Sequence, residues 1–212
     1  IKHAYTYGIK VENVSVDFKK NIQRSRDISN RLSKGIEFLM KKNKITHITG
    51  IGKLTSKTSL EVKNKQKTDT IEADKIILAT GARPKSFPGM EFDGNRVISF
   101  KEAMLLDSPP KKMIIIGSGA IGSEFAYYYN EFGTEVHMIE MLDRILPIED
   151  ADVSKEVGKS FKKSSIKIST GTKVSKIESL KTKVKVHTER NGKKEILEGD
   201  LALLAVGVTG NI

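Results

Sequence analysis

Three glycines and one glutamate stand at spacings that suit a ligand carrying a diphosphate. Gly117, Gly119 and Gly122 form a G-x-G-x-x-G pattern, and Glu140 follows further along the chain. The first glycine permits a tight turn, the second lets the main chain approach a diphosphate without a Cβ, and the third lets a helix and a strand pack closely. A diphosphate there would meet free backbone amides and the positive end of a helix dipole.

The sequence around this pattern favours a binding loop over a flexible turn. Apolar β-branched residues 114–116 precede Gly117, a helical stretch follows Gly122, and Gly133 ends that stretch before a second strand. Glu140 ends the second strand, where a carboxylate accepts hydrogen bonds from the hydroxyls of an adenosine ribose. Because a carboxylate repels a ribose 2′-phosphate, the pattern favours NAD over NADP. Arg144 lies nearby, but one arginine beside a glutamate is a poor phosphate clamp.

Two residues early in the predicted helix allow either of two readings. Ile121 and Glu124 project close to the expected path of the cofactor. Equally, Ile121 fits a core position and Glu124 complements the helix dipole. Spacing alone does not decide between these readings.

The hydrophobic pattern after residue 110 predicts an α/β domain. Strands and helices alternate there in a βαβαβ order typical of a Rossmann-like fold, followed by an antiparallel excursion with a tight turn at Asn191-Gly192. The expected strands are 112–116, 135–139, 166–169, 174–180, 183–189, 195–197 and 201–206, and the expected helices are 120–132 and 151–163.

The residues before 84 predict part of a second domain. Apolar residues at helical spacing follow Asp17, a plausible N-cap, and indicate a long amphipathic helix. A β-meander with strands 45–51, 60–63, 70–73 and 75–80 follows, and the apolar residues 76–81 are typical of a strand covered on both faces. The proline-rich residues 84–110 read as a connection with one short helix at 101–106.

Composition narrows the classes of function. The chain has no cysteine, which excludes disulfides, thiolate metal sites and a cysteine nucleophile, and its four histidines lack a metal-ligand spacing, so no metal is expected. The net charge of +11 comes mostly from lysines scattered among acidic residues, so we expect no nucleic-acid partner. No apolar run approaches the ~20 residues of a membrane helix. We expect a cytoplasmic protein, or one of an organelle matrix if it is eukaryotic, with no membrane association.

Three segments resemble the flavin-dependent pyridine nucleotide-disulfide oxidoreductases, and among them the dihydrolipoamide dehydrogenases most of all. They are residues 117–124 (GSGAIGSE), 140–147 (EMLDRILP) and 77–84 (ILATGARP). The resemblance runs from the long helix to the last strand. It implies a partial FAD-binding domain at 1–83, a connection at 84–110, an NAD-binding domain at 111–207 and the start of a return to the FAD domain at 208–212.

The resemblance also assigns residues to two cofactors. The residues it implies for FAD are few: Gly52, Thr80, Gly81 and Ala82. Those it implies for NAD, with Ile121 and Glu124 near the junction of nicotinamide and flavin, are Gly117, Ser118, Gly119, Ala120, Ile121, Gly122, Ser123, Glu124, Glu140, Val174 and Gly207.

The family implies an activity that these residues alone do not carry. Its members pass electrons from dihydrolipoamide through a redox disulfide to FAD and then to NAD, as homodimers attached to the lipoyl domains of 2-oxo acid dehydrogenase complexes. The family's cysteine pair, main FAD loop and catalytic His-Glu pair are not in this sequence, so we expect a fragment that has no catalytic residue, is inactive alone and binds FAD hardly at all. After Gly207, Val208 to Asn211 replace the arginine-containing turn common in relatives.

Two other interpretations stay open. One keeps the architecture and changes the substrate, as in mercuric reductase, transhydrogenase or a glutathione-type reductase, although Glu140 disfavours the members that prefer NADP. The other is a nucleotide-binding module without turnover, for which the lack of cysteine is natural. Flanking coding sequence with a Cys-x4-Cys motif would favour the enzyme.

Overall fold

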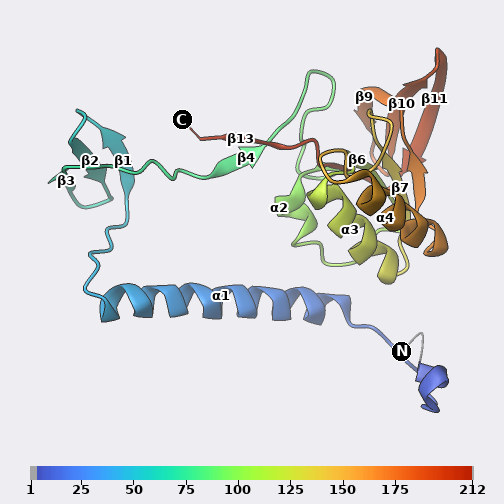
Figure 1. The fold of residues 1–212 in the computed structure, drawn as a ribbon, viewed down its shortest axis with the longest axis horizontal. Coiled ribbons are helices and arrows are strands. Elements are labelled where there is room, and N and C mark those ends of the chain that lie inside the picture. The colour runs from blue at the N-terminus through green and yellow to red at the C-terminus, as the bar shows by residue number, and fades with distance from the viewer. Residues whose placement is uncertain (1–3, 212) are drawn as a thin grey trace. The chain divides into compact units, whose positions relative to one another are not determined.

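The computed structural model describes residues 4–211, which separate into two compact units (Figure 1). The first unit comprises Ile1–Gln23 and Ala82–Thr209, and the second comprises Arg24–Gly81 and Gly210–Ile212. The division falls within the long helix α1 (Phe18–Lys42). Each unit is therefore described by itself.

A parallel sheet forms the centre of the first unit. Its strands lie in the order β5 (Val97–Ile98), β12 (Leu201–Leu204), β6 (Lys112–Ile116), β7 (Glu135–Ile139) and β8 (Lys167–Ser169). Every neighbouring pair is parallel. Helix α3 (Ala120–Glu131) joins β6 to β7, and α4 (Ala151–Lys163) joins β7 to β8. The predicted βαβαβ core is confirmed.

Alternate residues of the central strands supply two separate cores. Met113 and Ile115 of β6 belong to a cluster that includes the buried faces of α3 and α4. Their neighbours Ile114 and Ile116 belong to a second cluster with Val184 and others from the antiparallel sheet. Because successive side chains of a strand point to opposite faces, an apolar run fits a strand that is covered on both sides.

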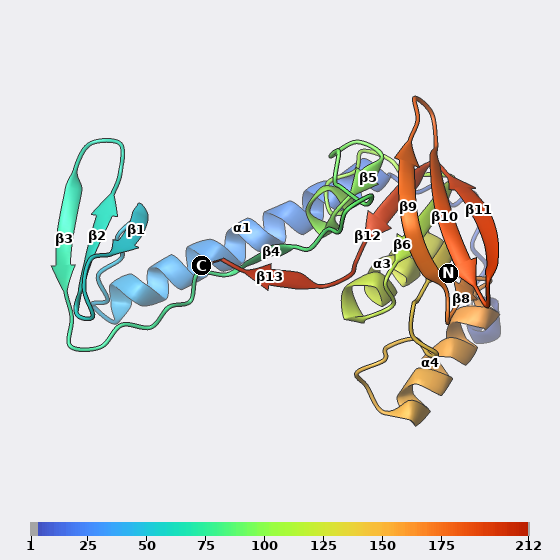
Figure 2. The ribbon, with the colours of Figure 1, turned by 90° about the horizontal axis from the view of Figure 1, so that it is seen from above.

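The second face of the parallel sheet is covered by the predicted antiparallel excursion. Strands β9 (Lys173–Ser179), β10 (Val184–Arg190) and β11 (Lys193–Gly199) pair in sequence order and lie side by side in Figures 1 and 2. Asn191 and Gly192 join β10 to β11 with φ angles of 50° and 76°. Positive φ at both central residues is the requirement of a type I′ hairpin turn.

The other face is closed by aromatic packing at the start of α1. Phe18 lies edge-on to Phe132 with ring centroids 5.0 Å apart, and the hydroxyl of Tyr128 donates to Asn21 over 2.9 Å. The hydroxyl of the fully buried Tyr129 donates to the carbonyl of Ala103 at the end of α2 (Phe100–Ala103). Asp17 Oδ1 accepts from the N–H of Lys20 at 2.9 Å, as expected for the start of the long helix.

Short elements complete the chain. A 3₁₀ helix, η1 (Ala4–Tyr7), precedes α1, and β4 (Ala82–Pro84) pairs with β13 (Val208–Gly210). The second unit contains the greater part of α1 and an antiparallel meander of β1 (Ile51–Leu54), β2 (Ser59–Lys63) and β3 (Thr68–Glu72). The long helix is confirmed, and β2 and β3 overlap the strands predicted at 60–63 and 70–73. The strand predicted at 45–51 is wrong over residues 45–50, because pairing with β2 begins only at Ile51. No helix within residues 4–211 has the length and apolar character that a bilayer span requires.

The buried strand predicted at 75–80 is wrong. Residues 75–81 have irregular backbone, and the side chains of Ile77 and Leu78 are 91% and 67% exposed. An apolar run becomes a strand only when neighbouring strands supply its backbone hydrogen bonds. No strand of the described residues pairs with this segment, and among its large apolar side chains only Ile76 is partly buried.

Candidate dinucleotide-binding site

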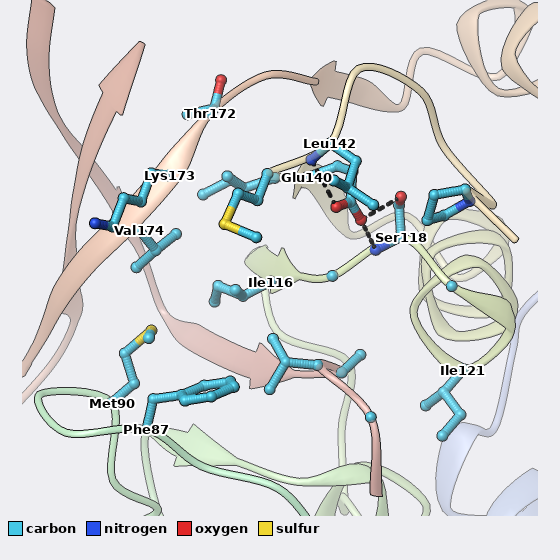
Figure 3. A pocket seen from close by; sticks show the side chains of 18 of the residues that line it. Phe87, Met90, Ile116, Ser118, Ile121, Glu140, Leu142, Thr172, Lys173 and Val174 are labelled. Atoms are coloured by element: carbon cyan, nitrogen blue, oxygen red, sulfur yellow. Dashed lines mark hydrogen bonds between the residues drawn. The ribbon is translucent and has the colours of Figure 1, made fainter. Parts of the chain in front are cut away.

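A cavity of about 810 Å³ opens at the carboxyl ends of β6, β7 and β12 in the first unit (Figure 3). In parallel α/β sheets this is the edge where ligands bind. The residues that follow the three strands form its floor. The complete lining is Phe87, Pro88, Met90, Ile116 to Ile121, Ile139 to Leu142, Pro147, Ile148, Thr172 to Ser175 and Ala205 to Gly207.

The three glycines of the loop differ in what surrounds them. A Cβ on Gly117, which has a φ of 96°, would lie 2.4 Å from the carbonyl oxygen of Ala205, and one on Gly122 would lie 2.0 Å from that of Gly117. A Cβ on Gly119 would meet nothing within 4 Å. Gly117 and Gly122 are therefore required by packing, whereas Gly119 leaves open space beside the cavity for a ligand.

Helix α3 directs its N-terminus at this open space. Gly119 is its N-cap and makes no side-chain capping hydrogen bond, and the first turn contains no acidic residue. The first amides of a helix lack partners within the helix and carry a partial positive charge. This end of α3 consequently fits an anionic group such as a diphosphate.

Glu140 is a buried carboxylate held by three donors. Its Oε2 accepts from the Ser118 N–H at 2.9 Å and from the Ser118 hydroxyl at 2.7 Å, and its Oε1 accepts from the Leu142 N–H at 3.0 Å. Its side chain is 8% exposed yet lines the cavity. A carboxylate in this position can accept a hydrogen bond from a sugar hydroxyl.

An apolar wall faces the glycine loop across the cavity. Phe87 and Met90 stand at the ends of a turn in which the Met90 N–H donates to the Phe87 carbonyl at 2.9 Å. Gly89, with a φ of 81°, accepts from the Ile177 N–H of β9 at 2.8 Å and fixes the turn against the antiparallel sheet. Sequence reasoning missed this wall. The Pro88-Gly89 pair signals a turn, but nothing in it indicates the strand on which the turn docks.

The structure gathers most residues that were predicted to contact NAD. Gly117, Ser118, Gly119, Ala120, Ile121, Glu140, Val174 and Gly207 all line the cavity. Gly122 and Ser123 lie behind the loop, where the Ser123 hydroxyl donates to the Ser118 carbonyl at 3.1 Å. Glu124 is exposed on α3 and is not part of the lining. The geometry thus places Ile121, and not Glu124, beside the cavity.

Arg144 is not among the residues that line the cavity. Its guanidinium donates to the carbonyls of Pro147 and Glu149 at 3.2 and 3.3 Å. The cationic side chain that lines the cavity is Lys173, which extends away from Glu140 (Figure 3). Within residues 4–211, no group of histidine, aspartate and glutamate side chains is arranged to hold a metal ion.

The residues assigned by resemblance to FAD form no cradle within the described residues. Gly52 lies in β1 opposite Val62, and the hydroxyl of Thr80 donates to the carbonyl of Asn211. The N–H of Asn211 donates to Gly81 at 3.0 Å, and Ala82 begins β4. Because Gly52 pairs within the meander while Thr80 and Gly81 bond to Asn211, these residues do not fit a flavin as they stand, and their role in FAD binding stays a prediction.

Comparison with known proteins identifies the family. The sequence matches the family described as pyridine nucleotide-disulphide oxidoreductase over residues 3–212. The chain belongs to the pyridine nucleotide-disulphide oxidoreductase family. Members of this family of oxidoreductases use FAD and a nicotinamide dinucleotide, so the glycine loop and the cavity agree with the family's chemistry.

Two relatives and two solved structures show how far the similarity extends. Over 99% of its own length, the chain is 39% identical to a dihydrolipoyl dehydrogenase of Rhizobium etli. Over all of its own length, it is 37% identical to a dihydrolipoyl dehydrogenase of Chlorobaculum parvum. The structure of LpdA from Mycobacterium tuberculosis matches 99% of the chain with a TM-score of 0.88 and 25% identity. The HOCl-induced flavoprotein disulfide reductase RclA from Escherichia coli matches 92% with a TM-score of 0.78 and 28% identity.

The chain spans about half the length of these relatives. It covers 47% of the Rhizobium protein, 45% of the Chlorobaculum protein, 46% of the LpdA chain and 44% of the RclA chain. The α/β fold class and the membership of the family are confirmed by these matches.

Proposed function

We propose that this chain is the NAD-binding portion of a dihydrolipoamide dehydrogenase-like flavoprotein. One observation carries the proposal: the buried carboxylate of Glu140 and the open space at Gly119 line the same cavity, at the N-terminus of α3. This combination suits a diphosphate joined to a ribose with free hydroxyls. The similarity to curated dihydrolipoyl dehydrogenases supports the assignment.

Each part of the cavity has a task in this proposal. The amides at the start of α3 hold the diphosphate, and Glu140 accepts from the ribose. Phe87, Met90 and Val174 supply apolar surface that excludes water from the rings of the coenzyme. When bound, NAD supplies a nicotinamide ring that accepts hydride, which is chemistry of the cofactor rather than of the protein. No residue of this chain is proposed as catalytic.

The proposal extends to the whole protein. We expect it to work in the cytoplasm as a homodimer, to hold FAD, to oxidise dihydrolipoamide with NAD as acceptor and to serve the lipoyl domains of 2-oxo acid dehydrogenase complexes. The full-length gene product should reduce NAD⁺ in the presence of dihydrolipoamide, which is followed as absorbance at 340 nm. The fold match to RclA supports a second candidate, another flavin disulfide reductase. A full-length protein that binds flavin but does not oxidise dihydrolipoamide would favour that second candidate.

Substitution of Gly119 tests the site in this chain. Gly119→Ala adds a Cβ that meets no protein atom, at a φ of −66° that alanine adopts freely, so stability should be unchanged. The methyl group would occupy the approach of the diphosphate, and we expect the Kd for NADH to rise by about tenfold or more, measured by calorimetry.

Gly158→Ala is the matched control. Gly158 lies in α4 and its added Cβ would make an ordinary contact of 3.8 Å with Ile145, away from the cavity lining. This variant should bind NADH as the parent chain does. Equal binding by the parent and Gly119→Ala, or tighter binding of NADPH than of NADH by the parent, would contradict the proposed site.

A further inference from the structure

Ser118 connects the two loops that line the cavity. Its side chain is 0% exposed, and its N–H and hydroxyl both donate to the same oxygen of Glu140 (Figure 3). Its carbonyl accepts from the Leu146 N–H at 3.0 Å and from the Ser123 hydroxyl at 3.1 Å. The main chain at residue 118 is therefore fixed by contacts that do not involve its own hydroxyl.

The hydrogen bonds of Glu140 leave little capacity for a ligand. A carboxylate accepts about four hydrogen bonds, two on each oxygen. The two positions of Oε2 are filled by Ser118, and Leu142 fills one position of Oε1. One acceptor position on Oε1 remains for a ligand, although an adenosine ribose offers two hydroxyls.

We propose that the Ser118 hydroxyl is a positioning residue that fixes the Glu140 carboxylate and thereby sets the preference for a coenzyme with a free ribose 2′-hydroxyl. This inference rests on the proposed function. A carboxylate held by three donors cannot turn away from a 2′-phosphate, so the like charges stay opposed. The nearby arginine, Arg144, is not part of the cavity lining, and one of its guanidinium nitrogens donates to the carbonyls of Pro147 and Glu149.

Loss of the Ser118 hydroxyl should release this restraint without disturbing the loop. In Ser118→Ala the carboxylate keeps the backbone N–H groups of residues 118 and 142 as donors but loses the third donor, the hydroxyl, which restrains Oε2. The carboxylate is then freer to turn, which weakens its fixed contact with the ribose of NADH and lessens its repulsion of NADPH. Discrimination between the two coenzymes should therefore fall.

The experiment compares the Kd of NADH with that of NADPH for the 212-residue chain, by fluorescence titration at fixed ionic strength. We expect the ratio of the NADPH constant to the NADH constant, Kd(NADPH)/Kd(NADH), to fall by about tenfold in Ser118→Ala, since hydrogen bonds to charged groups are among the stronger ones. A folded Ser118→Ala chain with the ratio of the parent would overturn the inference. Should this variant not fold, Ser118→Cys keeps the shape with a weaker donor, and its ratio must then fall as well.

Ser99→Ala is a matched control. Ser99 is also buried, and its hydroxyl donates to the carboxylate of Glu102 at 2.5 Å, but it lies at the start of α2 and not in the cavity lining. Its loss should lower the melting temperature and leave the coenzyme ratio unchanged. A parent chain that binds neither coenzyme would refute the proposed function, whereas a parent preference for NADH that survives Ser118→Ala would refute only the role of Ser118.

Discussion

The two units use similar sequence patterns with different results. In the first unit, apolar residues of the central strands are buried in two clusters, one on each face of the parallel sheet. In the second unit, residues of α1 at helical spacing such as Leu32, Ile36 and Leu39 are more than half exposed. Val62 is the one buried apolar side chain that the described part of this unit contributes.

This contrast shows that an amphipathic pattern specifies a face and not a core. The hydrophobic contribution to stability follows the apolar area removed from water, at about 25 cal/mol per Å². The first unit contains both the apolar strands and the helices and sheet that cover them. The second unit contains the apolar face of α1 and the apolar residues 77–79, and no element of the described residues buries either of them.

The largest expected effect is a difference in local stability between the units. Amides of β6, β7 and β12 should be the slowest to exchange with deuterium, because their strands are buried on both faces. Amides of residues 51–72 should exchange at least about a thousandfold faster, since opening that hairpin sheet exposes little buried surface. Hydrogen exchange read by mass spectrometry measures both, and equal protection of the two units would contradict the comparison.

The sequence predicted the first unit well because its signals are local. The strands at 112–116 and 135–139 and the helix at 151–163 were predicted with the boundaries that the structure shows. The two strands are short apolar segments that lie next to Gly117 and Gly133, and the helix has its apolar residues at helical spacing after the N-cap Asp150. The hairpin at Asn191-Gly192 followed from the positive φ that these two residues tolerate.

The features that the sequence did not predict correctly have a common physical cause. Each of them depends on contacts with residues that are distant in the sequence. Residues 76–81 read as a buried strand, but strand formation needs neighbours that sequence pattern cannot guarantee. The wall of Phe87 and Met90 depends on a hydrogen bond between Gly89 and Ile177, far apart in sequence. The restraint of Glu140 by the Ser118 hydroxyl is equally non-local. Spacing found the loop and the carboxylate, while only the fold shows that they are joined.

A pair of glycine substitutions sharpens the comparison at single positions. Gly122→Ala should lower the free energy of unfolding by about 3 kcal/mol, because its Cβ would lie 2.0 Å from a backbone oxygen in a packed loop. Gly52→Ala in β1 should change it by less than about 0.5 kcal/mol, since the added Cβ makes an ordinary 3.6 Å contact with Leu60. Urea unfolding followed by circular dichroism measures both variants. A similar loss in each would show that the two environments do not differ as the structure indicates.

The smallest expected effect is a pH dependence confined to the first unit. His137 of β7 is partly buried, with its Nε2 2.8 Å from the Ser169 hydroxyl. Burial lowers the pKa of His137 below its usual 6.5, and the positive charges of Lys167 and Lys112 lower it further against the opposing effect of Glu195 and Glu135. The unfolded chain therefore binds this proton more readily than the folded chain.

It follows that the stability contributed by neutral His137 is fully present above about pH 6.5. This contribution is lost as the pH falls below that value toward the lowered pKa. In His137→Gln this part of the loss should vanish, so the variant's urea midpoint should fall less between pH 7.5 and 5.5 than the parent's. Exchange of β7 amides should show the same difference, while residues 51–72 should not respond to the substitution. A parent and variant with parallel pH profiles would mean that His137 titrates alike in the folded and unfolded chain, and its burial against Ser169 would then not influence folding.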